Sequence, residues 1–214
     1  MWTQNTKTSR HYFYLFMAFF LLIGLTGCGM FKTQSKEEAL EDMKWSYGDN
    51  DIQITVEAEP DLNTWGGQPH TLLMTVVQME DLSAIEPYKG SSQAMSQLLL
   101  AEVAPTGLLN LKRFFIEPNA KQTLKLARVD KSHYVAVFLG YQHLDPARSI
   151  RLYQIGADFD YKGWVFRQYS AKPEPLAIQL RLGAEGIVAS ESERQAKKTL
   201  VQPKSGPLPI TPNN

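Results

Sequence analysis

The chain has 214 residues, with 22 basic and 22 acidic side chains and a single cysteine. This balance leaves no basic excess to neutralise phosphates, which argues against a nucleic-acid partner. One cysteine excludes a disulfide framework within the chain and a zinc site built from several thiolates.

The N-terminal segment has the layout of a secretory signal peptide. Lys7 and Arg10 precede an apolar run over residues 12–23, and small residues follow before Cys28. As a helix, this run would span about 18 Å, whereas the hydrocarbon core of a bilayer is about 30 Å thick. The run is therefore too short for a permanent transmembrane helix.

The residues Leu25-Thr26-Gly27-Cys28 resemble the lipobox, Leu-x-Gly-Cys, of bacterial lipoprotein signals. The resemblance implies that residues 1–27 are a signal peptide and that Cys28 then carries an S-diacylglycerol and an N-acyl chain. The alternative is that Cys28 is an ordinary thiol. A single acyl chain binds a membrane only marginally, but two or more anchor a protein stably. Gly29 follows where Asp would signal retention in the inner membrane, so we expect an outer-membrane protein facing the periplasm.

The next segment, residues 28–44, is expected to be a lipidated tether with a short helix. Ser35 and Glu38 have the spacing of a capping box at the start of that helix. Apolar and polar residues then alternate over residues 52–58, which predicts an antiparallel strand with one face in water. Residues 71–79 are apolar almost throughout, as in a strand covered on both faces.

Periodicity continues to favour strands along the rest of the chain. Ser91 or Ser92 can cap an inserted helix whose apolar stripe is best explained by core packing: Met95, Leu98, Leu99 and Val103. Strands separated by turn signals are predicted over residues 109–116, 123–129, 134–141, 149–155, 176–182 and 186–190, with 163–169 as a further candidate. The fold class is therefore mainly β, an antiparallel β-sandwich of seven to eight strands with a short inserted helix, over residues 45–190.

The C-terminal segment, residues 191–214, is polar and carries four prolines: Pro203, Pro207, Pro209 and Pro212. Such a composition cannot form a core, so we expect a disordered, proline-rich tail. The alternative is a tail that contacts peptidoglycan or a partner.

Neither catalysis nor metal binding is indicated. The histidines outside the signal peptide lie at predicted strand ends or turns: His70, His133 and His143. They are accompanied by no Gly-x-Ser-x-Gly or Ser-x-x-Lys motif. Two acidic pairs have the i, i+2 spacing of calcium loops but lack the remaining ligands: Asp49 with Asp51, and Asp158 with Asp160. We expect no enzyme, no metal and no cofactor, the covalent lipid on Cys28 apart.

The connection between the first two strands, residues 60–70, is long for a hairpin loop, which normally has two to five residues. Its prolines and glycines are expected to prevent regular pairing. Long loops that carry aromatic residues are frequent binding sites, and Trp is enriched at interface hot spots. Trp65 is therefore either an exposed anchor for a partner or a cap on the end of the core, and the sequence leaves both open.

Several segments together are similar to the TssJ lipoprotein family of type VI secretion systems, over residues 15–190. They are the lipobox, Trp45, the strand at 52–58, Asp61-Leu62-Asn63, Val77-Gln78-Met79, the leucine-rich helix, Phe115-Ile116-Glu117-Pro118 and the strand at 134–141. One departure is Asn119, where a glycine is expected after the proline. Asn tolerates a positive φ, so the turn can be kept.

This resemblance implies a transthyretin-like β-sandwich anchored in the outer membrane. It also implies binding of the periplasmic domain of the inner-membrane protein TssM through the loop between the first two strands. The expected contact residues are Asp61, Leu62, Asn63, Thr64 and Trp65. The alternative function is a periplasm-facing lipoprotein whose sandwich binds a small ligand or peptide, as a carrier or chaperone would, and it requires a large internal apolar cavity.

Overall fold

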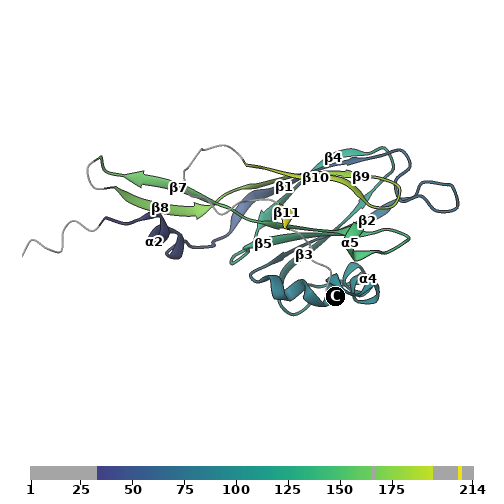
Figure 1. Cartoon of the computed structure of the whole chain (residues 1–214), viewed down its shortest axis with the longest axis horizontal. Coiled ribbons are helices and arrows are strands. Elements are labelled where there is room, and N and C mark those ends of the chain that lie inside the picture. The colour runs from purple at the N-terminus through teal and green to yellow at the C-terminus, as the bar shows by residue number, and fades with distance from the viewer. Residues whose placement is uncertain (1–32, 165–166, 195–206, 209–214) are drawn as a thin grey trace, which may run out of the picture.

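The computed structural model describes residues 33–164, 167–194 and 207–208. Two β-sheets pack face to face (Figure 1). The first contains β1 (Gly48–Ala58), β4 (Lys121–Arg128), β9 (Leu176–Leu182) and β10 (Ile187–Arg194), in the order β10-β9-β1-β4. The second contains β2 (Leu72–Met79), β3 (Leu108–Ile116), β5 (Tyr134–Gly140), β6 (Ile150–Gln154) and β11 (Pro207–Leu208), in the order β11-β6-β5-β2-β3. The predicted β-sandwich is confirmed.

A separate hairpin projects from one end of the sandwich, together with a short helix (Figure 1). The hairpin consists of β7 (Ala157–Lys162) and β8 (Gln168–Pro173), and the helix is α2 (Lys36–Glu41). The predicted capping box of α2 is present, because Ser35 Oγ accepts from the Glu38 amide and the Glu38 carboxylate accepts from the Ser35 amide. The remaining helical segments lie beside the second sheet: η2 (Leu82–Ile85), α3 (Glu86–Lys89), α4 (Ser92–Leu100) and α5 (Pro146–Ser149).

The core lies between the two sheets and follows the predicted alternation of β1. Ile52, Ile54 and Val56 are fully buried and pack in one apolar cluster with residues of β2, β5 and β9. A second cluster lies on the other face of the second sheet, where α4 covers it with Met95, Leu98 and Leu99. Because both of its faces are covered, β2 is apolar at almost every position, as predicted.

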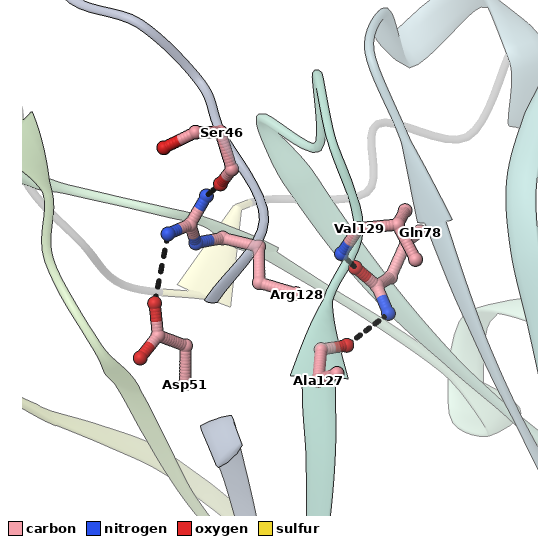
Figure 2. A network of polar contacts seen from close by, with 6 residues as sticks. All are labelled: Ser46, Asp51, Gln78, Ala127, Arg128 and Val129. Atoms are coloured by element: carbon pink, nitrogen blue, oxygen red, sulfur yellow. Dashed lines mark hydrogen bonds and ion pairs between the residues drawn. The ribbon is translucent and has the colours of Figure 1, made fainter. Parts of the chain in front are cut away.

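Gln78 and Arg128 form side-chain hydrogen bonds near the start of β1 and the end of β4 (Figure 2). Gln78 of β2 lies in the second sheet, yet its amide group donates to the Ala127 carbonyl and accepts from the Val129 amide, each at 2.9 Å. The buried Arg128 donates to Asp51 at 2.7 Å and to the Ser46 carbonyl. Gln78 thereby ties the two sheets together through the backbone of the β4 end.

The structure corrects several sequence expectations. In the described residues, the two packed sheets contain four and five strands, nine in all, against the seven to eight predicted, and the separate hairpin adds β7 and β8. The strand predicted as antiparallel at 52–58, β1, pairs antiparallel with β4 on one side but parallel with β9 on the other. The candidate strand at 163–169 is displaced: Gly163, with φ of 88°, begins the turn between β7 and β8, and β8 starts only at Gln168. Helix α4 ends at Leu100, which leaves Val103 exposed instead of on its apolar stripe.

Two further boundaries differ at the C-terminal side. The strand β10 continues past Ser190 to Arg194, because the antiparallel pairing with β9 offers hydrogen bonds to polar residues as readily as to apolar ones. Within the predicted tail, Pro207 and Leu208 pair with the edge strand β6. The rest of that tail, 195–206 and 209–214, lies outside the described residues.

Candidate functional site

The loop between β1 and β2 lies at the end of the molecule opposite the β7–β8 hairpin (Figure 1). Its first half is held firmly against the sandwich. Leu62 is fully buried as part of the core, and the amides of Asn63 and Thr64 donate to the carbonyls of Gly183 and Ala184. This half of the loop is therefore a structural base and not a free segment.

Asn63 fixes the base of the loop through its side chain. Its φ of 48° lies in the left-handed region, which Asn tolerates better than most residues. The side-chain amide donates to the Thr71 carbonyl at 3.2 Å, and its oxygen accepts from the Gln142 amide at 2.9 Å. With only 8% of its surface exposed, Asn63 positions the loop and is not available to a partner.

The second half of the loop is a small hairpin with Trp65 at its start. Trp65 and Gln68 exchange two backbone hydrogen bonds of 2.9 and 3.1 Å around Gly66 and Gly67. Both glycines have positive φ, 59° and 76°, as the tight two-residue turn of a β-hairpin requires. The expectation that glycines prevent regular pairing here is therefore wrong, because paired glycines are what this turn type needs.

Trp65 is 57% exposed and contacts the ring of the exposed His70, with 6.0 Å between ring centroids. The sequence left two interpretations of Trp65 open, and the structure contradicts the one in which Trp65 covers the end of the core. Leu62 is buried at that position instead. The five predicted contact residues thus divide: Asp61, Thr64 and Trp65 are accessible, whereas Leu62 and Asn63 are buried. Gln68 and His70 are also accessible, although they were not among the predicted contact residues. The Gly66-Gly67 pair is the feature of the sequence that could have indicated a turn with Gln68 at its end.

The histidines do not form a catalytic arrangement in the described residues. His70 and His143 are exposed in two different loops, and His133 is half-buried against Trp45, with ring centroids 4.1 Å apart. Burial lowers the pKa of His133, and the nearby carboxylates of Glu80 and Asp81 partly oppose this effect. His133 is therefore a packed residue at the end of the core.

The described residues contain no cluster of three or more histidine, cysteine or acidic side chains that could hold a metal ion. Two of the surface hollows among the described residues have volumes of about 360 and 370 Å³, and neither of these two is the internal apolar cavity that a carrier requires. One is lined by the polar side chains of Gln34, Glu38, Glu41, Asp42 and Gln168. No helix among the described residues is long and apolar enough to cross a membrane.

Cys28 lies outside the described residues, so its lipidation stays a prediction. The described chain starts at Thr33, and Gln34 forms a bridge with Gln168 of β8, at the end of the molecule that carries the hairpin. The described chain therefore begins at the end of the molecule opposite the β1–β2 loop (Figure 1).

A rigid β-sandwich with an exposed aromatic residue on a well-anchored loop is typical of a protein-interaction domain. The chain belongs to the family described as Type VI secretion lipoprotein, VasD, EvfM, TssJ, VC_A0113, whose model matches residues 50–182. This match confirms the TssJ resemblance, and it places the chain in a family of structural type VI secretion lipoproteins.

Solved structures of low sequence identity are also similar to this chain. The T6SS lipoprotein TssJ1 from Pseudomonas aeruginosa has a TM-score of 0.47 and 16% identity, covering 71% of this chain and 98% of its own. Serratia marcescens Lip, a membrane-bound component of the type VI secretion system, has a TM-score of 0.46 and 16% identity, covering 71% and 99%. A structure described as the TssM C-terminal domain from EAEC has a TM-score of 0.42 and 13% identity, covering 64% and 94%. Comparison with curated protein sequences gives no match.

Proposed function

We propose that this chain is the outer-membrane lipoprotein of a type VI secretion membrane complex, with a lipid on Cys28 and the sandwich facing the periplasm. The β1–β2 loop binds the periplasmic domain of a TssM-like inner-membrane protein. The protein acts as a structural link: its lipid fixes one end of an envelope-spanning assembly, and its loop holds the other.

The observation that carries this proposal is the position of Trp65. It is an exposed aromatic residue on a hairpin whose base is fastened to the sandwich by Leu62 and Asn63. Preorganisation of this kind lowers the entropic cost of binding, because little of the loop has to be ordered when a partner arrives. The loop also lies at the end of the molecule opposite the start of the described chain, which follows Cys28 by five residues, so a lipid and a partner can be held at the same time (Figure 1).

The accessible residues suggest how the contact works. Trp65 supplies a large apolar surface beside the His70 ring, and the accessible polar residues Asp61 and Thr64 precede it in the same loop. An aromatic anchor with a polar rim is the usual anatomy of a protein interface. Leu62 and Asn63 contribute indirectly, by holding this surface in place.

The partner is tested by a pull-down from detergent-solubilised envelopes, followed by calorimetric titration with the periplasmic domain that is recovered. Trp65→Ala should weaken binding by about 2 kcal/mol or more, roughly thirtyfold. Trp164→Ala is the matched control, because Trp164 is also exposed but lies in the distant hairpin connection. Equal affinities for the wild type and Trp65→Ala would move the contact to another loop.

The anchor is tested separately with Cys28→Ser. Without the thioether-linked lipid, the protein should leave the outer-membrane fraction while its domain stays folded, because Cys28 precedes the sandwich. A variant that remains in the outer-membrane fraction without lipid would refute the anchor.

A further inference from the structure

The hairpin of β7 and β8 carries exposed aromatic residues that the core does not explain. At its base, Ala157 and Phe159 are buried against Met43, so this end is part of a small apolar cluster. Toward the turn the environment changes, and Tyr161 is 59% and Trp164 92% exposed. We define the hairpin tip as Tyr161, Lys162, Gly163, Trp164 and Arg167. The tip belongs to neither main sheet and projects from the sandwich (Figure 1).

The chain enters the domain beside this tip. Lys162 and Gln168 form the last pair of the hairpin before its turn, and Gln34 bridges in parallel to the same Gln168. The Tyr169 amide donates to the Gln34 carbonyl at 3.2 Å, which fastens the entering segment to β8. Because the bridge is parallel, the entering segment runs in the direction of β8, from the turn toward the base.

The length of chain before Gln34 limits the distance to the lipid. Gln34 is the sixth residue after Cys28, and six fully extended residues span at most about 22 Å. A lipid on Cys28 therefore holds the hairpin tip close to the surface of the leaflet into which its acyl chains insert. The β1–β2 loop, at the opposite end of the molecule, points away from that leaflet (Figure 1).

The side chains of the tip suit a bilayer interface. Tyr and Trp are enriched at the headgroup level, because their rings are apolar and their polar atoms stay hydrated. Lys162 and Arg167 flank the turn, and the guanidinium of Arg167 lies 5.1 Å from the centre of the Tyr161 ring. Residues 161–169 contain no acidic side chain. Long basic side chains of this kind place their charge among phosphates while their stems cover apolar surface.

Acidic residues near the hairpin tip weaken its attraction to an anionic membrane surface. Helix α2 packs beside β8 and carries Glu37, Glu38 and Glu41, followed by Asp42. Glu38 is used in the capping box, and Asp42 accepts from the Gln34 side chain at 2.9 Å. Because these carboxylates offset the basic residues, general attraction to an anionic surface is weak. Insertion of the aromatic rings therefore contributes more to the contact than charge does.

We propose that the hairpin tip is a second membrane contact, with Tyr161 and Trp164 at the headgroup level of the leaflet that holds the lipid, and with Lys162 and Arg167 beside phosphates. This inference rests on the lipid anchor at Cys28. A lipid alone fixes where the domain is, whereas a lipid and a rigid tip together also restrict how the domain tilts. The tip thereby directs the β1–β2 loop away from the membrane.

Tryptophan fluorescence tests the contact in the processed, lipidated full chain, reconstituted into phosphatidylethanolamine–phosphatidylglycerol vesicles. Phospholipids brominated on their acyl chains close to the headgroup quench only tryptophans at the interface. The chain beyond Cys28 contains Trp45, Trp65 and Trp164. Quenching should be present in the wild type, largely lost in Trp164→Phe and retained in the matched control Trp65→Phe. Both variants replace exposed rings, so their melting temperatures should equal that of the wild type.

The outcomes separate this inference from the proposed function. A protein that does not float with the vesicles lacks the anchor, and the proposed function fails together with this inference. If the protein floats but Trp164→Phe leaves the quenching unchanged, the anchor stands and the membrane contact is refuted. Equal quenching of Trp164 by aqueous iodide in vesicles and in detergent would also refute it, and would leave the tip in water or free for a protein partner.

Discussion

Leu62 and Trp65 lie three residues apart in one loop and have opposite environments: Leu62 is fully buried in the core, and Trp65 is 57% exposed. Leu62 holds the loop against the sandwich, and the loop exposes Trp65 to solvent. Substitution of each by Ala therefore separates the two roles.

Leu62→Ala should lower the free energy of unfolding by about 2–5 kcal/mol, because truncation leaves a cavity in a packed core. Trp65→Ala should change it by less than about 0.5 kcal/mol, as is usual for a surface position. Urea denaturation curves of the two variants measure the difference. The reverse order of effects would mean that Trp65, and not Leu62, closes the end of the core.

The turn at Gly66 and Gly67 gives a second prediction. At Gly66 a Cβ would meet no atom within 4 Å, so only the φ of 59° opposes substitution. Gly66→Val should loosen the hairpin, since a left-handed conformation costs most residues about 1–2 kcal/mol. Gly66→Asn is the matched control and should keep the turn, because Asn tolerates this φ. Hydrogen exchange of the Trp65 and Gln68 amides reports the turn, and equal rates in both variants would contradict this account.

Gln78 carries a third prediction, because its amide group joins the two sheets (Figure 2). Gln78→Ala leaves the Ala127 carbonyl and the Val129 amide without this partner, and each such buried group costs about 1–3 kcal/mol. We expect a loss of about 2–4 kcal/mol in the free energy of unfolding. Gln93→Ala, at an exposed position of α4, is the control and should have almost no effect. Similar small losses in both variants would show that apolar packing alone holds the sheets together.

His133 makes stability depend on pH. Burial lowers its pKa in the folded protein, so the unfolded chain binds the proton more readily. Its contribution to stability is therefore present above the ordinary histidine pKa of about 6.5 and is lost as the pH falls through the lower pKa of the folded state. Melting temperatures between neutral and mildly acidic pH should fall less in His133→Gln than in the wild type. The exposed His143 provides the control, and an identical slope in His133→Gln and His143→Gln would rule out this origin.

Much of the fold could be predicted because burial on one face leaves a period in the sequence. The alternation at 52–58 and 176–182 marks β1 and β9, and the capping box at Ser35 marks α2. Asn119 has the positive φ, 61°, that its place in the turn requires. These features depend on neighbouring residues only, so a single sequence contains the information.

What could not be predicted depends on residues far apart in the chain. Leu62 and Trp65 are both large and apolar, and only the packing of distant strands decides which of them is buried. The bridge from Gln78 to the β4 end joins residues about fifty positions apart, and Gln78 by itself looks like a polar break in an apolar strand. The β7 strand was not predicted, because the i, i+2 spacing of Asp158 and Asp160 was compared only with calcium loops, whose remaining ligands are missing here, and not with the alternation of a strand.

The parallel pairing of β1 with β9 also determines when the fold can form. Ile52 is paired with Leu176, so the centre of the first sheet joins segments from opposite ends of the domain. Closing so long a loop costs entropy before any contact offsets it, and folds rich in such pairings form slowly. Since a chain is synthesised from its N-terminus, β1 exists before β9 does, and the edge of β1 that pairs with β9 stays unpaired until β9 has been made. During that interval, an edge of alternating apolar residues is open to pairing with another chain.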